Sequence, residues 1–445
     1  MEHYIFYCKL SLLAVLSLIT ACCMLSRRWY VNLAAFLACL SGETFLAHLF
    51  FPGYMLCPAA ASFIILFLSR IWDLSRTPAK GNGADPIRLP VRSGIRESRL
   101  EFYYHYSNFL VYGGAGSGKT KSIGKWLLSE YMRLGFAGFI YDFKDTDYTR
   151  TAYNLIKRHR YPHKFYYVSF DRPERSYRFN PLKVVRDRTE LIQLMEDVLL
   201  ALLPKKEQQN EWVAGGLGIL RGVAFRFWDE FPEHCTLPHI LAFIMTASAR
   251  QLSLFLQQNL VSEMLAGAYL KAEGSEKTQA SYLSTLCNNL ATVSQNEEIA
   301  YVLSGDDFDF NLIDPETPKL FAVSNNFSEN SVYAPVISML MTISARQFSM
   351  QNRIPFVYFL DEMTTVNIKN FETLPSVLRE YKAAFILLTQ SGAKLENLYG
   401  KLDRSSVEAN FGNMFLGRTK DVEALKYYPL FFGKEEKERR SRSSG

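Results

Sequence analysis

Short apolar runs alternate with stretches of helical periodicity in two separate parts of the chain. Apolar positions at helical spacing occur over 121–134, after the apolar run 108–112, and over 332–348, before the apolar run 356–360. Strands that alternate with helices are typical of a parallel sheet covered on both faces, so the pattern predicts an α/β fold. The runs with the length of buried strands are 108–112, 138–141, 165–168, 319–323, 356–360 and 384–390.

A purely helical pattern separates these two parts. From 189 to 300 the apolar residues recur at spacings of three and four, as at Leu191 and Leu194, with almost no strand signal. We therefore expect an all-α domain inserted into the sheet-forming domain. The sheet is then built from two separated blocks, 98–188 and 301–432.

The N-terminal part contains two long apolar stretches. Residues 5–25 are apolar apart from Lys9, and 49–68 carry no charge, so each is long enough to cross about 30 Å of hydrocarbon. We expect 1–70 to be a transmembrane helical anchor. A secretory signal peptide is the competing interpretation of the first stretch, although no small-residue cleavage site stands out and a second apolar stretch follows.

The number of membrane spans stays open. Two spans place Arg27 and Arg28 outside, against the tendency of basic residues to remain in the cytoplasm. A third span over 31–50 places both inside but buries Glu43, at a cost of about 2.5 to 3.5 kcal/mol. In either arrangement the rest of the chain is expected in the cytoplasm, because basic residues follow the last span. These residues are Arg70, Arg76, Lys80 and Arg88.

Two segments have the composition of connecting or solvated chain. Pro, Gly and basic residues are frequent from 77 to 94, so we expect a linker over 71–97 and the start of the folded domain near Ser98. Residues 433–445 are charged and of low complexity, which predicts a solvated tail.

Composition and charge add few constraints. The 445 residues, 48% of them hydrophobic, can bury the cores of two or three structural units. The net charge of +6 permits a polyanionic partner without requiring one. The seven cysteines contain no C-x-x-C pair, so they imply no disulfide framework or zinc site. Lipidation of Cys22 and Cys23, near the end of the first apolar stretch, is an alternative that no strong motif marks.

A glycine-rich segment after the first strand fits the phosphate-binding pattern G-x-x-x-x-G-K-[ST] at every fixed position. Its backbone N–H groups would surround a phosphate, Lys119 would reach the β- and γ-phosphates from a solvent-reachable loop, and Thr120 would bind Mg²⁺. An accidental glycine-rich turn is the alternative, but a strand before the segment and a helix after it favour the phosphate loop. This loop consists of Gly113, Gly114, Ala115, Gly116, Ser117, Gly118, Lys119 and Thr120.

Two carboxylates follow the apolar run 356–360. A buried parallel strand that ends in Asp361 and Glu362 would present both side chains to the same edge of the sheet as the phosphate loop. Asp361 would hold Mg²⁺, and Glu362 would orient and deprotonate an attacking water. Acidic residues also commonly cap the helix that follows a strand, which is the alternative interpretation.

The order of these motifs resembles a known family. The phosphate loop is followed by 141–144 (YDFK), 179–182 (FNPL), Trp212 in the helical stretch, the acidic strand, and 389–391 (TQS) with 397–400 (NLYG). This ordered set resembles the type IV secretion coupling proteins, the TraG/TraD-like ATPases of conjugative DNA transfer, over roughly residues 100 to 430. Members of that family usually continue through further strands, and often a substrate-selecting tail, beyond the point where this sequence ends.

The resemblance implies a RecA-like P-loop NTPase domain that carries the inserted all-α domain, together with ATP and Mg²⁺ as cofactors. It also implies a homo-hexameric ring at the bacterial inner membrane. Each chain would cross the membrane more than once, contact lipid there and keep its ATPase domain in the cytoplasm. Its partners would be single-stranded DNA with a bound relaxase and the components of a type IV secretion channel.

Two further residues take roles from the resemblance. Gln390 would sense the γ-phosphate, with a solvent-facing loop side chain as the alternative. Arg379 would reach across to the active site of a neighbouring subunit. Its alternatives are an ion pair with Glu380 or Glu372, or a contact to the γ-phosphate within the same chain.

Asp142 and Lys144 allow two interpretations. They either face the nucleotide pocket or form an ion pair at the mouth of a strand. The residues that contact DNA are not evident, because basic side chains on a helical surface usually form only a solvated face. The candidates on the helical insertion are Lys205, Lys206, Arg221, Arg250 and Lys271.

Three functions are consistent with the sequence. The first is a membrane-tethered ATPase that brings DNA with its relaxase to a secretion channel and drives conjugative transfer. The second is a coupling ATPase that feeds effector proteins to the channel, which the motor residues do not distinguish from the first. The third is a nucleotide-gated docking platform that moves nothing.

Overall fold

The computed structural model describes residues 85–93, 96–144, 146–203, 208 and 210–432. The expected membrane anchor and charged tail therefore lie outside the described residues, as do Lys205 and Lys206. Within the described part of the chain, no helix combines the length and the apolar character that a membrane crossing requires.

A seven-stranded sheet forms the centre of the described chain, in the order β5-β6-β4-β7-β8-β3-β9. Every neighbouring pair is parallel, which confirms the α/β prediction. The sequence did not predict β9, a short edge strand whose side chains are only half-buried. The strands are β3 (Phe109–Tyr112), β4 (Ala137–Asp142), β5 (Lys164–Ser169), β6 (Lys319–Ser324), β7 (Phe356–Leu360), β8 (Ala383–Thr389) and β9 (Asn413–Leu416).

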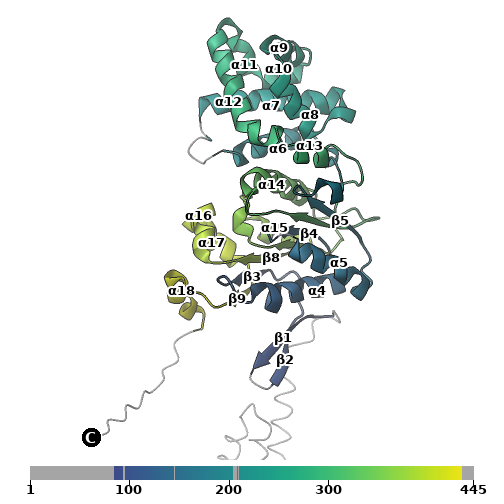
Figure 1. Cartoon of the computed structure of the whole chain (residues 1–445), viewed down its shortest axis with the longest axis vertical. Helices are drawn as coiled ribbons and strands as arrows, with labels where there is room; N and C mark the ends of the chain where they lie inside the picture. Colours follow the sequence, from purple (N-terminus) through teal and green to yellow (C-terminus); the bar gives the residue numbers. More distant parts are fainter. Residues whose placement is uncertain (1–84, 94–95, 145, 204–207, 209, 433–445) are drawn as a thin grey trace, which may run out of the picture. The chain divides into compact units, whose positions relative to one another are not determined.

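Side chains of the strands alternate between two apolar cores. Phe109 and Val111 of β3 join the core formed with helices α4 (Lys125–Arg133) and α5 (Asp147–His159). Leu110 and Tyr112 of the same strand join the other core, to which helix α14 (Asn330–Arg346) contributes. Helices therefore cover both faces of the sheet (Figure 1), as the continuous apolar character of its strands requires.

The helical insertion is built around α7, whose glycines allow close contact with a neighbouring helix. A Cβ atom at Gly218 would lie 2.7 Å from the carbonyl oxygen of Leu265, and one at Gly222 would lie 2.9 Å from that of Ser262. The helices appear as one group in Figure 1. They are α6 (Arg188–Ala201), α7 (Glu211–Glu230), α8 (Leu237–Thr246), α9 (Ala249–Gln257), α10 (Leu260–Leu265), α11 (Gly267–Lys271), α12 (Glu276–Ser294) and α13 (Glu297–Leu303).

Polar contacts join this insertion to the sheet-forming part. Asp197 of α6 accepts a hydrogen bond of 2.8 Å from Arg346 of α14, and its other carboxylate oxygen lies 2.8 Å from the ammonium of Lys369. Asp197 is nearly buried, so its two cationic partners compensate for the loss of water. The remaining elements are α15 (Leu374–Glu380), α16 (Gly392–Tyr399), α17 (Lys401–Ala409), α18 (Val422–Phe432), the π-helical turn η1 (Lys119–Gly124) and the 3₁₀ turns η2 (Pro173–Arg175), η3 (Pro181–Val184), η4 (Pro232–His234), η5 (Ala272–Gly274) and η6 (Met363–Thr365).

A β-hairpin replaces the last part of the linker that the sequence predicted over 71–97. Strands β1 (Ile87–Ser93) and β2 (Arg96–Phe102) pair antiparallel. Ile87 and Leu89 alternate inward and are buried in the core that contains α4. The linker prediction was wrong here because the Pro- and Gly-rich composition concealed this short alternation.

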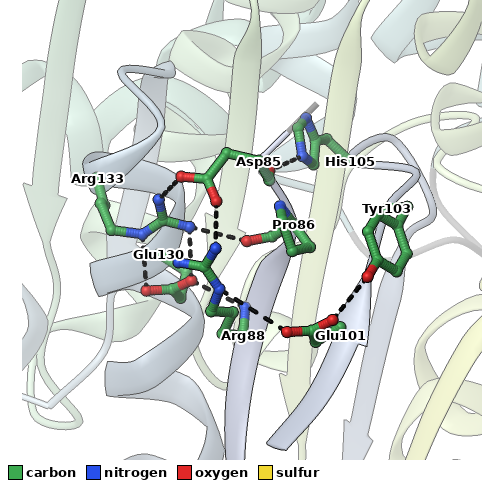
Figure 2. A network of polar contacts seen from close by, with 8 residues as sticks. All are labelled: Asp85, Pro86, Arg88, Glu101, Tyr103, His105, Glu130 and Arg133. Carbon is green, nitrogen blue, oxygen red and sulfur yellow. Dashed lines mark hydrogen bonds and ion pairs between the residues drawn. The ribbon is translucent and has the colours of Figure 1, made fainter. Parts of the chain in front are cut away.

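A polar network ties the hairpin to α4 (Figure 2). Glu130 of α4 accepts the backbone N–H of Arg88 at 2.8 Å and binds the guanidinium of Arg133 at 2.9 Å. Arg133 also contacts the Asp85 carboxylate and donates to the carbonyl of Pro86 at 2.8 Å. Since α4 follows the phosphate loop, these contacts connect the hairpin to the helix that leads from it.

Candidate active site at the carboxyl edge of the sheet

The phosphate loop connects β3 to η1 and is fixed by backbone contacts on both sides. Gly113 donates to the carbonyl of Thr389 at 3.3 Å, and Gly114 donates to that of Arg418 at 3.0 Å. Gly116 and Gly118 have φ angles of 71° and 88°, in the left-handed region that glycine adopts without a steric penalty. The glycines at these two positions therefore serve the backbone path of the loop.

Lys119 lies in a buried position, although the expected solvent-reachable loop that carries it includes the exposed residues Ala115 and Gly116. It is 7% exposed, its ammonium donates to the carbonyl of Gly113, and it lies 3.7 Å from Oε1 of Glu362. Burial lowers the pKa of Lys119, and the Glu362 carboxylate opposes that shift. The loop folds over its own lysine, and the oxygens of Gly113 and Glu362 replace the water that the buried ammonium loses.

Asp361 presents a buried carboxylate at the end of β7. It is fully buried, and neither carboxylate oxygen has a hydrogen-bond partner among the described residues. Burial raises the pKa of Asp361 to about 7, although the ammonium of Lys144, 3.9 Å away, opposes the shift. A buried carboxylate without donors is expensive, and a divalent cation is a partner that would offset this cost.

A magnesium ion fits these surroundings. Thr120 follows Lys119 in the phosphate loop and is only half-buried, so the loop and β7 each offer one oxygen ligand. The described residues contain no cluster of three or more His, Cys, Asp or Glu side chains able to hold a metal. Mg²⁺ is commonly held by one or two protein oxygens together with water and substrate phosphates, so Thr120 and Asp361 suit it.

Glu362 adopts a strained backbone conformation, with φ 43° and ψ 47°. Left-handed geometry is costly for a residue with a side chain and is concentrated at functional sites. Thr365 holds the Glu362 carbonyl through its hydroxyl at 2.7 Å and its N–H at 2.9 Å. The Glu362 side chain is only 4% exposed and makes no capping hydrogen bond to η6, which follows it, so it does not serve as a helix cap.

Gln390 and Lys144 both reach the Glu362 carboxylate. The Gln390 amide donates to Oε1 of Glu362 at 3.5 Å, and the Lys144 ammonium lies 3.5 Å from the same oxygen. Strand β8 lies between β7 and β3, so its end brings Gln390 between the acidic pair and the phosphate loop. The alternative interpretation from the sequence, a Gln390 side chain that faces solvent, does not fit this contact with Glu362.

Asp142 has a different role from Lys144. Its carboxylate accepts the backbone N–H of Thr149 at 2.8 Å and the Thr149 hydroxyl at 2.9 Å, which fixes the first turn of α5. It also accepts the N–H of Lys144 at 3.3 Å. Lys144 therefore faces the acidic pair, whereas Asp142 orients the segment that carries it.

Sequence reasoning missed a buried polar chain behind Glu362. The Tyr141 hydroxyl lies 2.6 Å from the Thr365 hydroxyl and accepts a hydrogen bond of 3.0 Å from Asn325. Thr365 in turn holds the Glu362 carbonyl. These residues come from the ends of three different strands or the loops after them, so only the sheet order brings them together. Tyr141 belongs to the 141–144 motif, and this motif was the sequence signal from which part of the polar chain could have been predicted.

Arg379 is not brought to the active site of its own chain. It is exposed at the end of α15, beside the edge where β8 begins, whereas the site lies where β8 ends. A strand of this length separates the two edges by roughly 20 Å, which rules out the contact within one chain. Among the described residues, Arg379 forms no ion pair with Glu372 or Glu380.

The DNA-contact candidates on the helical insertion differ in their surroundings. Arg221 forms an ion pair of 2.6 Å with Glu196, so part of its charge is already compensated. Arg250 and Lys271 are exposed.

The order of the central strands defines a class of protein. A strand lies between the one that enters the phosphate loop and the one that ends in the acidic pair, as in RecA-like P-loop nucleotide-binding domains. Within that class, the chain belongs to the type IV secretion-system coupling proteins, because residues 100–445 match the model of the DNA-binding domain of that family. A comparison with curated protein sequences gives no match.

Solved structures of the conjugative coupling protein TrwB are similar in fold. TrwBdeltaN70 in complex with sulphate has a TM-score of 0.55 at 16% identity, over 77% of this chain and 75% of that one. TrwB with ADP and Mg²⁺ gives 0.56 at 16% identity over the same shares. TrwB with the ATP analogue ADPNP gives 0.55 at 17% identity, again over 77% and 75%.

Proposed function

We propose that this protein is a Mg²⁺-dependent ATPase. The observation that carries the proposal is the fully buried Asp361 carboxylate, which has no hydrogen-bond donor among the described residues and lies beside Lys144 and Glu362. Lys119 and the backbone of the phosphate loop would bind the phosphates, and Thr120 and Asp361 would hold Mg²⁺. The cation would neutralise charge on the phosphoryl oxygens.

Glu362 is the residue suited to activate water. It is buried, held by a strained backbone and contacted by Gln390. Its carboxylate can accept a proton from a water molecule in line with the terminal phosphate, and Gln390 can fix its orientation. Binding of the phosphates would draw Lys119 away from Glu362, which leaves the carboxylate free to act as a base.

We further propose that ATP hydrolysis serves conjugative DNA transfer. Membership of the coupling-protein family supports this role, as do the two apolar stretches within 1–70. In this proposal the chain is a multi-pass protein of the bacterial inner membrane with its ATPase domain in the cytoplasm. A hexamer recruits single-stranded DNA with its relaxase to a type IV secretion channel, and hydrolysis drives the transfer.

The test uses the full-length protein purified in mild detergent. We expect ATPase activity that requires Mg²⁺ and rises with single-stranded DNA, with the stimulation falling steeply as salt increases. Stimulation by a partner protein alone would favour effector secretion, and turnover indifferent to both would favour a docking platform. Flotation of the protein with membrane vesicles tests the anchor.

Two substitutions test the site. Lys119→Ala should reduce turnover by at least about 100-fold, because it removes the buried cation from the phosphates. Glu362→Gln should still bind ATP and fail to hydrolyse it. Lys157→Ala, an exposed lysine on α5, is the control and should keep the wild-type rate. Near-normal hydrolysis by Lys119→Ala would contradict the assignment of the phosphate loop.

A further inference from the structure

A cavity of about 590 Å³ lies between α5, β5 and the turn η2. It is lined by three arginines and several aromatic rings, and no acidic side chain is among its lining residues. Because β5 and β3 stand at separate places in the sheet order, with four strands between them, the cavity is distinct from the phosphate loop. The side chains that matter here are Arg150, Arg172, Arg175, Tyr153, Tyr167 and Tyr177.

Two of the tyrosine rings are unusually accessible. Tyr153 is 63% exposed and Tyr177 is 42% exposed. Arg150 is also exposed, and no ion pair of Arg150 occurs within the described residues. Arg175 has one ion pair, a 3.8 Å contact with the adjacent Glu174, and both side chains are largely exposed. Accessible rings and guanidinium groups thus share one concave surface.

This chemistry indicates the class of ligand. Guanidinium groups match phosphate geometry and stack on flat rings, and exposed tyrosines are platforms on which unpaired bases stack. A duplex keeps its bases stacked within the helix, so it would leave the tyrosines unused. Several rings and several arginines together exceed what one nucleotide would engage.

We propose that this arginine–tyrosine cavity binds single-stranded DNA. The proposal rests on the proposed function as a DNA-stimulated ATPase and assigns the contact to a part of the chain outside the helical insertion. Bases of the strand stack on Tyr153 and Tyr177, and the arginines contact its phosphates.

A chain of hydrogen bonds and one ion pair connects the cavity to the acidic pair. Thr149 lines the cavity, and its N–H and hydroxyl hold the Asp142 carboxylate at 2.8 and 2.9 Å. Asp142 accepts the N–H of Lys144, whose ammonium lies 3.5 Å from Glu362. Single-stranded DNA that binds in the cavity and shifts the first turn of α5 therefore moves Lys144 relative to Glu362. This is a route by which bound DNA changes the ATPase rate.

Binding is measured by fluorescence anisotropy with a labelled oligothymidylate and the full-length protein in detergent. Tyr153→Ala should weaken binding by at least about fivefold, since each base stacked on an aromatic ring contributes substantially. It should leave the salt dependence unchanged, and Tyr153→Phe should bind like wild type. Arg150→Gln should weaken binding and reduce the slope of affinity against salt by about one.

Arg158→Gln is the matched control, because it removes the same charge from an exposed position on α5 that does not line the cavity. It should bind DNA like wild type. Thr149→Val keeps the shape of the side chain but removes its hydroxyl, so it should retain DNA affinity and lose part of the stimulation of ATPase activity. An iodouracil-containing oligonucleotide should crosslink to Tyr153 or Tyr177.

The outcomes separate this proposal from the proposed function. If wild type binds DNA and is stimulated by it while Tyr153→Ala and Arg150→Gln match wild type, the cavity is not the site, although the function stands. If wild type neither binds nor responds to single-stranded DNA, the proposed function itself fails. Displacement of the oligonucleotide by thymidine monophosphate at equal nucleotide concentration would make the cavity a mononucleotide site and overturn the proposal.

Discussion

The ammonium of Lys144 lies 3.5 Å from Oε1 of Glu362, the same oxygen that Lys119 approaches to 3.7 Å. Lys119 is buried, whereas the side chain of Lys144 is 44% exposed. In the proposed function Lys119 moves to the phosphates, so Lys144 is the cation that would remain with the acidic pair throughout a catalytic cycle. It also opposes the rise in the pKa of Asp361.

The first prediction concerns the pH dependence of hydrolysis. In the proposed site Mg²⁺ would bind the ionised form of Asp361, whose pKa is raised to about 7, so kcat/KM should rise with pH through that region and then level off. Lys144→Met removes a charge that favours the ionised form, and the acidic limb should move to higher pH. Lys157→Met, with an exposed lysine on α5, should keep the wild-type profile. A Lys144→Met profile that coincides with wild type would contradict this role.

The second prediction concerns stability without Mg²⁺ and nucleotide. Asp361 has a pKa near 7 in the folded chain and its ordinary value of 3.8 when unfolded. The folded state therefore binds the extra proton, and this contribution to stability is lost as pH rises from about 4 to 7. The side chain of the Asp361→Asn variant does not titrate. In EDTA the melting temperature of the variant should therefore rise relative to that of wild type as the pH increases from 5 to 8. A constant difference across this range would show that Asp361 titrates normally.

Much of the central sheet could be predicted because its strands are buried on both faces. Continuous apolar runs such as 356–360 are visible without any knowledge of their neighbours. The edge strand β9 was missed, since Asn413 and its half-buried neighbours give no such run. The hairpin was missed for a related reason, because its apolar signal is short: among the side chains of β1 whose burial is described, Ile87 and Leu89 reach the core.

Parts of the site could be predicted from local sequence, and parts could not. Gly113–Thr120 and Asp361–Glu362 follow recognisable strands, so their types and positions already indicate their chemistry. The burial of Lys119 depends on how the loop closes over it, which no spacing records. Likewise, the contact of Lys144 with Glu362 depends on β4 and β7 being adjacent in the sheet.

The third prediction concerns Gln390. Its amide restrains Glu362 through a hydrogen bond of 3.5 Å, so Gln390→Ala should lower kcat by about tenfold or more and change the KM for ATP much less. Lys394→Ala, an exposed position in α16, is the control. Steady-state ATPase kinetics separate the two parameters. Loss of ATP affinity with an unchanged kcat would assign Gln390 to nucleotide binding.

The fourth prediction concerns the attachment of the hairpin to α4. Glu130 accepts the N–H of Arg88 and pairs with Arg133 (Figure 2), and Glu130→Ala leaves both groups without this acceptor. We expect the substitution to lower the free energy of unfolding by about 1 to 3 kcal/mol. Limited proteolysis should then cut within residues 85–102 earlier than in wild type. Glu101→Ala removes a more exposed carboxylate of β2 and should be cut at the wild-type rate.

The last prediction is that Arg379 completes the active site of a neighbouring subunit. It is an exposed arginine at the edge of the sheet opposite to its own phosphate loop, and it has no ion pair among the described residues. A guanidinium supplied from another subunit can raise phosphoryl transfer by about 10³ to 10⁵. ATPase activity per subunit should therefore rise with protein concentration as the ring assembles.

Mixing two inactive variants distinguishes action between subunits from a local structural role. Arg379→Ala keeps its phosphate loop and Lys119→Ala keeps its Arg379, so one type of interface in a mixed ring contains an intact half-site from each. Some activity should return on mixing, with a maximum at intermediate ratios. Arg353→Ala removes another exposed arginine at the same edge of the sheet and should be active by itself. A rate per subunit that is independent of dilution, with no activity at any mixing ratio, would exclude a shared active site, because each chain would then have to hydrolyse ATP alone.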